Sequence, residues 1–282
     1  MKPASDFHVH THYSGCCKET YGIKEAWNAA RERGVETLGI SDHDVPFKNQ
    51  HLKKQRVIVS ELENVMLGLE VSIRDGNGKI MVSRENLELL DYFLISEHIH
   101  IMPSWTLMKK GRKNFTSWWK NPQERYKIEK FYKKHAMMTF KALERNKPDI
   151  LAHPWRYPWH GGILDKATLD VYEKVLQKAA KLGVRIELSR SVMNLVISDI
   201  EGRGVKSINI EEFPSWKGEM DHELMQPLEF FKRYAKNCLA NGVEFSLGSD
   251  AHKLAEIGNF PNIDNFIKVL DIPENKIVQT LK

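Results

Sequence analysis

One repeated pattern constrains the fold of this chain more than any other: short strand-like runs that end in histidine or carboxylate side chains, separated by helical stretches. Seven runs are candidate strands: Asp6–His10, Glu36–Ile40, Val65–Val71, Tyr92–Ser96, Ile150–His153, Val184–Leu188 and Glu244–Gly248. The side chains at or just beyond their ends are His8 and His10, Asp42 and His43, Glu70, His98, His153, Glu187, Asp250 and His252. In ordinary core strands these positions would be apolar, so the pattern predicts a shared site.

Strands that alternate with helices are typical of a mostly parallel sheet. Helices are predicted at Ile23–Arg33, Asp165–Leu182 and Pro227–Asn241, because each stretch ends just before a glycine, which favours helix termination. The arrangement predicts about seven β/α units in a barrel, and a barrel places its active site at the C-terminal ends of its strands. A chain of 282 residues fits one such domain over residues 1–282.

The segment Ile101–Lys147, between the fourth and fifth candidate strands, is predicted to be a helical insertion. Asn121 and Pro122 are typical of a helix start, and apolar residues then recur at helical spacing. Between Lys109 and Lys134 there are ten Lys or Arg and two Glu, a local excess of positive charge. The whole chain carries only +5, which by itself does not indicate a nucleic-acid partner.

Composition also bears on location. No apolar run approaches the roughly 20 residues needed to span a bilayer, and no apolar signal-peptide region precedes the first histidines. Three cysteines, of which Cys16 and Cys17 are adjacent, make a poor disulfide framework. We therefore expect a cytoplasmic protein with reduced cysteines and no membrane partner.

The side chains at the strand ends suit metal binding. His8 and His10 are two residues apart on a predicted strand, where side chains alternate between faces, so both imidazoles face the same side. Glu70 directly follows the apolar run Met66–Leu69, and a buried carboxylate is costly unless it is paired or bound to a metal. Each residue alone is more commonly a satisfied core or loop residue. Together they predict a metal cluster, and mixed histidine and carboxylate ligands suit zinc, iron or manganese.

Six motifs, taken in order, resemble the PHP (polymerase and histidinol phosphatase) family. They are H-x-H-T from His8, S-D-H from Ser41, G-L-E from Gly68, D-Y-x-x-x-S-x-H from Asp91, A-H-P from Ala152 and G-S-D-A-H from Gly248. The resemblance extends from Asp6 to His252. It implies a distorted TIM-like barrel of seven β/α units with two or three divalent or transition-metal ions in its mouth. A stand-alone barrel of this size is most similar to the histidinol phosphatase branch.

The resemblance also implies a ligand set for each ion. The implied ligands are His8, His10, Glu70 and Asp250 for the first ion, Glu70, His98 and His153 for the second, and His43, His252 and one residue near the first motif for the third. Family members carry Asp or His five or six residues after the second histidine, where this chain has Gly15 and Cys16. Cys16 could bind as a thiolate, which would favour zinc. His12 and Glu19 are the alternatives.

Other residues have subsidiary roles in this hypothesis. Glu187 is expected to orient a ligand histidine rather than to bind metal. Arg156 and Arg190, each three residues beyond a strand-end residue, are expected to bind phosphate, and Lys253 is a further candidate. His100 is either a decoy or an orienting group, and His160 could reach the mouth. Trp155 and Trp159 are expected near the mouth, where they could contact an organic moiety of the substrate. The histidines that match no motif and are expected at the surface are His51, His135 and His222.

The predicted chemistry is phosphate-ester hydrolysis. Two ions about 4 Å apart can activate water and stabilise an in-line displacement, and the chain has neither a G-x-S-x-G motif nor a P-loop. The leading hypothesis is hydrolysis of a small phosphomonoester, with histidinol phosphate as one candidate. The alternative is a 3′–5′ exonuclease or other nucleic-acid phosphodiesterase, because the basic insertion with Trp118 and Trp119 could hold a single strand. A non-catalytic metal-binding barrel is the third hypothesis. The sequence leaves the substrate, the metals and the oligomeric state open.

Overall fold

The computed structural model describes residues 3–17, 19–44, 49–98, 115–155, 164–203 and 210–281. Its strands form two parallel sheets and a short hairpin. The first sheet has the order β1 (Ser5–Val9), β2 (Thr37–Ile40), β3 (Val65–Leu67). The second has the order β4 (Glu70–Ser72), β5 (Leu94–Ser96), β6 (Ile150–Leu151), β7 (Arg185–Ser189), β10 (Phe245–Gly248). The predicted α/β fold with parallel strands is confirmed.

The two sheets meet at both edges. The predicted third strand is two strands, because β3 ends at Leu67 in the first sheet and β4 begins at Glu70 in the second. A parallel bridge between His43 and Glu70 adjoins this junction. At the opposite edge, Val9 pairs with Ala251, whose carbonyl oxygen accepts a hydrogen bond from the backbone N–H of His10 at 3.1 Å. The strands of the two sheets therefore succeed one another in chain order.

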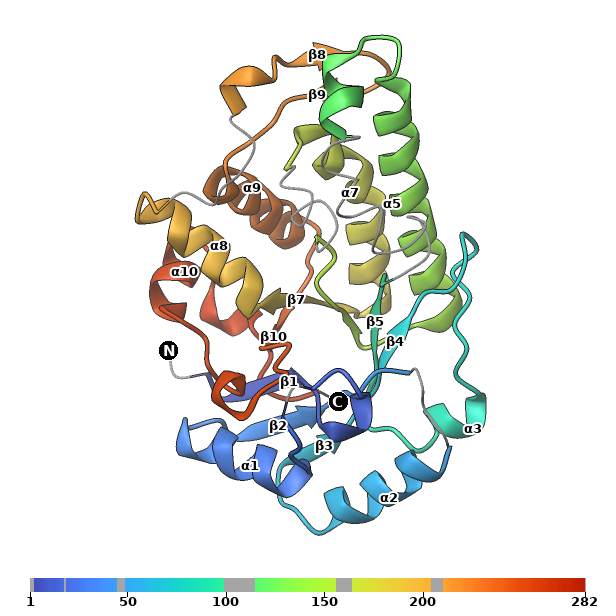
Figure 1. Cartoon of the computed structure of the whole chain (residues 1–282), viewed down its shortest axis with the longest axis vertical. Coiled ribbons are helices and arrows are strands. Elements are labelled where there is room, and N and C mark those ends of the chain that lie inside the picture. The colour runs from blue at the N-terminus through green and yellow to red at the C-terminus, as the bar shows by residue number, and fades with distance from the viewer. Residues whose placement is uncertain are drawn as a thin grey trace.

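Helices cover the outer faces of both sheets (Figure 1). They are α1 (Ile23–Glu32), α2 (Asn49–Ser60), α3 (Arg84–Leu87), α5 (Tyr126–Asn146), α7 (Lys166–Leu182), α8 (Arg190–Ile200), α9 (Pro227–Ala240) and α10 (Ile263–Val269). The three helices predicted from glycine stops are present. In α7, for example, the Asp165 side chain accepts from the Ala167 N–H at the start, and Gly183, with φ of 70°, ends the helix. Within the described ranges, no helix is both long enough and apolar enough to cross a membrane.

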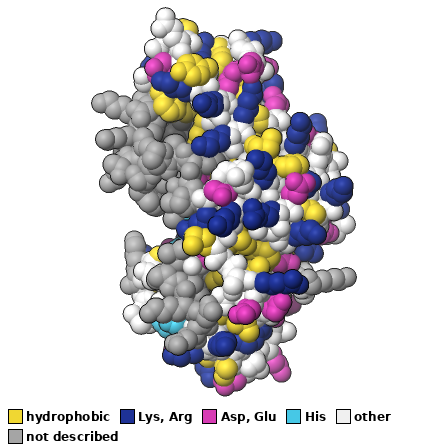
Figure 2. All heavy atoms as spheres, turned by 90° about the vertical axis from the view of Figure 1, so that its right-hand side faces the viewer, with side chains coloured by type: hydrophobic (Ala, Val, Ile, Leu, Met, Phe, Trp, Pro, Cys, Tyr) yellow, Lys and Arg dark blue, Asp and Glu magenta, His cyan; other side chains and the backbone are white. Residues whose placement is uncertain are grey.

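The insertion begins its long helix later than predicted. Residues 115–120 are helical, but Pro122 lies in a turn, where the Asn121 side chain accepts from the Gln123 N–H at 3.0 Å. Helix α5 starts only at Tyr126. Figure 2 shows the side of the molecule that carries α5, on which basic side chains are interspersed with acidic ones. The first cations of the basic segment, Lys109 to Lys113, lie outside the described residues.

The prediction that His222 and His135 are surface residues is wrong. His222 ends the hairpin of β8 (Trp216–Lys217) and β9 (Asp221–His222) and is fully buried. Its Nδ1 lies 2.7 Å from a carboxylate oxygen of Asp165, its Nε2 lies 3.3 Å from Glu129, and the Trp216 ring stacks on it. These contacts attach the hairpin to α5 and to the start of α7.

His135 lies on α5 and is buried against α7, where its Nδ1 is hydrogen-bonded to the Tyr172 hydroxyl. Burial lowers the pKa of His135 to about 4, so the ring is neutral at physiological pH. The third histidine without a motif, His51, is half-buried beside Tyr13. A histidine without a motif partner in the sequence can therefore still find partners on distant elements.

Tyr92 fills the space between β1, β2 and the junction of the two sheets. It is 2% exposed, and its hydroxyl donates to the Phe7 carbonyl oxygen at 2.7 Å. A Cβ at Gly39 would lie 2.1 Å from this hydroxyl, and a Cβ at Gly68 would lie 2.3 Å from the tyrosine Cζ. Both glycines are therefore required for the ring to occupy the interior.

Replacing Gly39 with alanine should destabilise the fold. The new methyl group would clash with Tyr92 and lie 3.0 Å from the backbone of Phe7, and neither neighbour can move freely in a filled interior. Overpacking of this kind typically lowers the free energy of unfolding by about 1–3 kcal/mol. Urea denaturation followed by circular dichroism measures the change. Gly76→Ala is the matched control, because no atom lies within 4 Å of its added methyl. Equal stability of the two variants would contradict this packing.

Candidate metal centre

The structure gathers the side chains predicted as metal ligands at the strand ends. Their positions are His8 in β1, His10 directly after it, His43 after β2, Glu70 at the start of β4, His98 after β5, His153 after β6, and Asp250 and His252 after β10. All are fully or partly buried. Residues that are up to about 240 positions apart in the sequence therefore share one site.

The Glu70 carboxylate is the centre of this cluster. Glu70 is fully buried, and five imidazole nitrogens lie within 3.5 Å of its two oxygens. They are His43 Nδ1 (2.8 Å), His8 Nε2 (3.3 Å) and His10 Nε2 (3.5 Å) at Oε2, and His153 Nε2 (2.9 Å) and His98 Nε2 (3.0 Å) at Oε1. Each oxygen thus faces its own group of imidazoles, as a carboxylate that bridges two cations would require.

Electrostatics keep this carboxylate ionised despite its burial. Burial disfavours the charged form, but nearby imidazoles, chiefly those of His98, His8 and His43, outweigh it and hold the pKa of Glu70 well below its usual range. His98 responds in the opposite way, since burial lowers its pKa to about 4 even though Glu70 is adjacent. A neutral imidazole and an ionised carboxylate are the forms that bind metal.

Asp250 joins the group at Oε2 of Glu70. Its Oδ1 lies 3.1 Å from His10 Nε2 and 3.6 Å from His8 Nε2. The backbones of Asp250 and His153 have φ of 52° and 25°, in the left-handed region. Such residues cost on the order of 1–3 kcal/mol each and persist where the surrounding structure enforces them. Two strained ligand-type residues in one cluster are typical of a functional site.

Glu187 holds His8 from the side opposite Glu70. One oxygen lies 2.6 Å from His8 Nδ1, and the other accepts from the backbone N–H of His153 at 2.7 Å. The neighbouring strand makes room with Gly248, where a Cβ would lie 1.9 Å from the Glu187 carboxylate. Glu187 therefore fixes the His8 ring with Nε2 directed into the cluster, which is the geometry expected of an orienting residue.

The Ser14 hydroxyl, which was not predicted as part of the site, and the Asp42 carboxylate, one of the predicted strand-end residues, orient His10. Ser14 Oγ lies 3.0 Å from His10 Nδ1, accepts from the His43 N–H at 3.1 Å, and donates to Asp42 at 2.6 Å. Asp42 also accepts hydrogen bonds from Thr11 and from a helix α2 side chain, Gln55. It therefore anchors the loop after β1.

His98 has a similar support. Its Nδ1 lies 3.2 Å from Ser72 Oγ, which donates to Asp44 at 3.1 Å, and Asp44 forms an ion pair with Arg74 at 2.9 Å. Ser72 stands two residues after Glu70 on the same strand, so the alternation of side chains could have identified it. Asp44 and Arg74 have no such signal, because the contact joins two separate loops.

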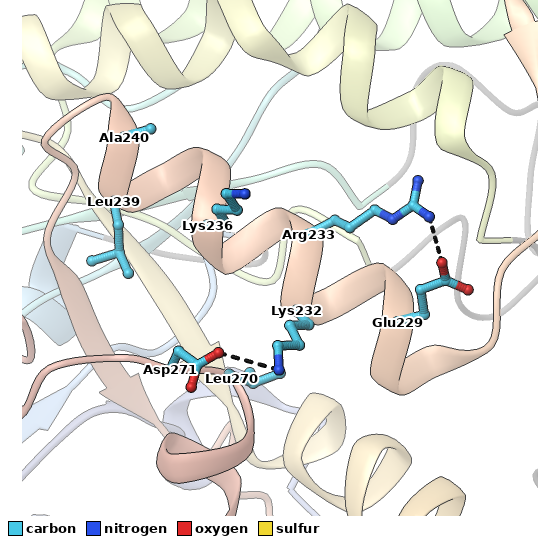
Figure 3. A pocket seen from close by; sticks show the side chains of 8 residues that line it. All are labelled: Glu229, Lys232, Arg233, Lys236, Leu239, Ala240, Leu270 and Asp271. Carbon is cyan, nitrogen blue, oxygen red and sulfur yellow. Dashed lines mark hydrogen bonds and ion pairs between the residues drawn. The ribbon is translucent and has the colours of Figure 1, made fainter.

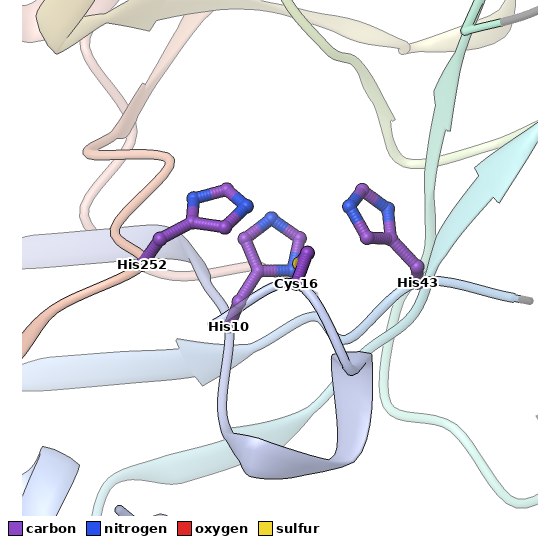
Figure 4. Close-up of side chains that lie close together, drawn as sticks. All are labelled: His10, Cys16, His43 and His252. Atoms are coloured by element: carbon purple, nitrogen blue, oxygen red, sulfur yellow. The ribbon is translucent and has the colours of Figure 1, made fainter. Parts of the chain in front are cut away.

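Of the three candidate ligands for the third ion near the first motif, only Cys16 lies beside His43 and His252 among the described residues. Ligand atoms of His10, Cys16, His43 and His252 all lie within 4.8 Å of one another (Figure 4). The two alternatives have other partners: His12 Nδ1 is hydrogen-bonded to the Tyr21 carbonyl oxygen, and the Glu19 carboxylate accepts from the Leu254 N–H.

Arg190 lies at the rim of the cluster. It opens α8 and pairs with Glu256 at 3.0 Å, and the same carboxylate accepts from the His252 N–H at 3.0 Å. Lys253 is half-buried directly after His252. The predictions for His100, Arg156, Trp159 and His160 fall outside the described residues.

The prediction that Trp155 contacts an organic substrate is wrong. Trp155 is 2% exposed and packs against the rings of Tyr172, Phe230 and Tyr234, so it belongs to the core between α7 and α9.

A surface hollow of about 690 Å³ lies away from this cluster, against α9 (Figure 3). Its lining residues are Glu229, Lys232, Arg233, Lys236, Leu239, Ala240, Leu270 and Asp271. Ion pairs join Lys232 to Asp271 and Arg233 to Glu229 across its wall. None of the histidine and carboxylate residues of the cluster lines it, so it is not the candidate site.

Comparisons with known proteins identify relatives of this chain. A model of the PHP domain family matches residues 6–191. A probable phosphatase of Acetivibrio thermocellus is 26% identical over 286 residues, covering 99% of this chain and 92% of the relative. A probable phosphatase of Photobacterium profundum is 24% identical over 280 residues, covering 97% of this chain and 88% of the relative.

Two solved structures resemble the fold. One is histidinol phosphate phosphatase from Lactococcus lactis, solved with zinc, L-histidinol and phosphate; it has a TM-score of 0.58 at 12% identity and covers 96% of this chain and 94% of its own. The other is a chain in the structure of archaeal ribonuclease P with mature tRNA, with a TM-score of 0.52 at 13% identity, covering 96% and 84%. At these identities the likeness is evidence of fold alone.

Replacing Glu70 with glutamine should remove more metal from the purified protein than replacing Glu187 with glutamine. A glutamine keeps the shape but has one acceptor oxygen and no charge, so contacts on both sides of the cluster are disturbed. Loss of an orienting group such as Glu187 typically costs about 10–100-fold in metal affinity or activity. Elemental analysis of the variants gives metal ions per chain.

The control is Glu61→Gln, which changes an exposed carboxylate paired with Lys24 at 2.9 Å. It should retain the metal content of the parent protein. If the Glu70 and Glu187 variants hold equal metal, Glu70 is not the shared ligand.

Proposed function

The chain belongs to the PHP domain family, and from this membership we propose that it is a metal-dependent phosphatase that hydrolyses a small phosphomonoester. The observation that carries the proposal is the buried Glu70 carboxylate, whose two oxygens face separate groups of imidazoles. Relatives named as probable phosphatases, which align over nearly the whole chain, support the same class of reaction.

The donor set fits two divalent ions that share Glu70. His8 Nε2 is a buried atom to which the described residues supply no hydrogen bond, a condition that a bound cation would relieve. The proposed ligands are His8, His10 and Asp250 for one ion, His98 and His153 for the other, and Glu70 for both. This mixture of imidazole and carboxylate suits zinc, iron or manganese.

Two bound ions would lower the pKa of water and neutralise charge on the phosphoryl oxygens. The protein's own residues provide the conditions for that chemistry. The surrounding imidazoles hold the pKa of Glu70 well below its usual range, so the carboxylate is ionised before an ion binds, whereas the raised pKa values of His8 and His43 mean that these two rings would release a proton on binding metal. Glu187 and Ser14 hold the rings of His8 and His10 in place. No serine or cysteine nucleophile is required.

Arg190 is proposed to bind the phosphate from the rim. Its guanidinium is planar and suited to bidentate recognition of phosphate oxygens. The Glu256 carboxylate holds it next to the backbone of His252 and so limits its freedom before the substrate arrives. Arg156, which follows His153 by three residues, is proposed as a second phosphate-binding residue.

The described part of the basic insertion favours a small substrate over a nucleic acid. Three of its cations are engaged by carboxylates: Lys120 by Glu212 at 3.3 Å, Lys127 by Glu124 at 2.9 Å, and Lys133 by Glu219. Of the two tryptophans that could stack on a base, Trp119 is fully buried against Phe213 and Trp216, and Trp118 is half-buried with the Lys127 ammonium 5.7 Å from its ring centre. Paired cations and a buried tryptophan offer little to a single strand.

The proposal predicts metal-dependent hydrolysis of phosphomonoesters. Protein stripped with a chelator should be inactive on a panel that includes p-nitrophenyl phosphate and histidinol phosphate, and zinc, manganese or iron should restore turnover. Changing Lys109, Lys110, Arg112 and Lys113 to Gln should cost less than about tenfold in kcat/KM, roughly 1.4 kcal/mol, because surface charge acts mainly on encounter. Binding of labelled single-stranded DNA should be weak.

Each alternative has its own outcome in the same assays. Cleavage of DNA without phosphomonoester turnover would indicate a nuclease, as would DNA affinity that falls with salt at a log–log slope of about −0.7 per phosphate contacted and is lost in the neutralised variant. Bound metal without hydrolysis of either substrate would indicate a non-catalytic metal-binding barrel.

A further inference from the structure

The carboxylate of Asp6 is a buried acidic group that the candidate metal centre does not include. Asp6 lies in β1, two residues before His8, and is fully buried. Its Oδ1 accepts from the backbone N–H of Ser249 at 2.9 Å and from that of His8 at 3.3 Å, and its Oδ2 accepts from the backbone N–H of Gly258 at 2.8 Å. A buried polar group is stable only where hydrogen bonds replace those made to water. Asp6 therefore holds together backbone from two distant segments of the chain.

The hydrogen bond from the His8 N–H lies within a bulge of β1. Asp6 pairs with Leu38 of β2 and Val9 pairs with Ile40, so two residues of β1 lie opposite one residue of β2. His8 is one of the two, and its ring is directed into the candidate metal centre. A bulge of this kind bends its strand and redirects side chains, and bulges are frequent beside active sites. The direction of the His8 ring therefore depends on a bulge that the Asp6 carboxylate closes.

Asp6 also closes the loop that follows β10. This loop runs from Ser249 to Gly258 and carries two candidate ligands, Asp250 and His252. The Asp6 carboxylate accepts from the backbone N–H at each end of it. Asp250 has φ of 52°, and a left-handed backbone of this kind persists only where surrounding contacts enforce it. The hydrogen bond at Ser249 acts on the residue directly before that strained position. One side chain therefore fixes both β1 and the loop after β10.

We propose that Asp6 is a positioning residue for the metal ion held by His8, His10 and Asp250. The proposal rests on the two-ion function above and names the group that sets one of its two ion positions. All three ligands lie on the segments that Asp6 joins, whereas the two histidines of the second ion follow β5 and β6. Metal–ligand distances tolerate a displacement of only about 0.2 Å. Loosening these segments should therefore release the first ion and leave the second in place.

Asp6→Asn tests this role, with manganese(II) as the probe. The amide keeps the size of the side chain but offers one acceptor oxygen, and its NH₂ group would face a backbone N–H. Two manganese ions that share a carboxylate couple magnetically, so the parent protein, just saturated with manganese, should give the electron paramagnetic resonance signal of a coupled pair. Asp6→Asn at the same manganese concentration should give the signal of an isolated ion. Its affinity at the first position should fall about 10–100-fold, as is typical when a group behind a ligand is lost.

Combination with ligand variants identifies the ion that is lost. Adding Asp6→Asn to Asp250→Asn should change the manganese content little, because both substitutions act on the same position. Adding it to His98→Asn should remove the manganese that remains at the first position. The opposite pattern would assign the effect of Asp6 to the second ion and overturn the proposal.

Asp165→Asn is the matched control. Asp165 is likewise fully buried and accepts from two backbone N–H groups, those of Ala167 at 3.1 Å and Glu223 at 2.9 Å, but it joins the start of α7 to the β8–β9 hairpin. This variant should be less stable to urea than the parent protein and should keep the coupled signal. If Asp6→Asn also keeps the coupled signal, or if both variants lose it, the positioning role is overturned while the two-ion function stands.

Asp6→Ser repeats the test if Asp6→Asn does not fold. The serine hydroxyl is too short to reach both segments, and it can accept from a backbone N–H rather than oppose it. The same loss of the coupled signal is expected. A parent protein that gives no coupled signal would overturn the two-ion function itself, an outcome distinct from a failure of Asp6.

Discussion

The burial of one ionised carboxylate, Glu70, governs the architecture of this molecule. Removing a carboxylate from water costs several kcal/mol unless opposite charge and hydrogen bonds compensate, and here five imidazoles from four separate segments supply that compensation. Glu70 stands where the chain leaves the three-stranded sheet and enters the five-stranded one. This location puts it within reach of the strand ends of both sheets. The split of the predicted third strand is therefore the feature that allows one side chain to face two groups of ligands.

Around the carboxylate, a second layer of polar contacts fixes each ring. Glu187 acts on His8, Asp42 acts on His10 through Ser14, and Asp44 reaches His98 through Ser72. These contacts leave the Nε2 atoms directed at the centre, a preorganisation that spares the protein from ordering long side chains when an ion binds. The scaffold beneath is tightly filled, and Gly39, Gly68 and Gly248 leave the space that Tyr92 and Glu187 occupy. Rigidity at the strand ends follows from both layers.

The sequence was informative where a residue's role depends on its place along one strand. Histidines and carboxylates at successive strand ends predicted which side chains would meet. It failed where partners come from distant elements. His222 is buried because its ring nitrogens contact the carboxylates of Asp165 and Glu129, which lie 57 and 93 residues away in the sequence. Trp155 is buried because α7 and α9 cover it. Asp44 and Arg74 were missed for the same reason. The choice among Cys16, His12 and Glu19 also required the loop geometry after β1.

X-ray diffraction from crystals of the metal-loaded protein, with anomalous maps recorded at the absorption edge of the bound metal, tests the central claim most directly. The account predicts an anomalous peak at each oxygen of Glu70, with His8, His10 and Asp250 around the first and His98 and His153 around the second. A single peak that leaves one Glu70 oxygen without a metal, or peaks located away from Glu70, would contradict it.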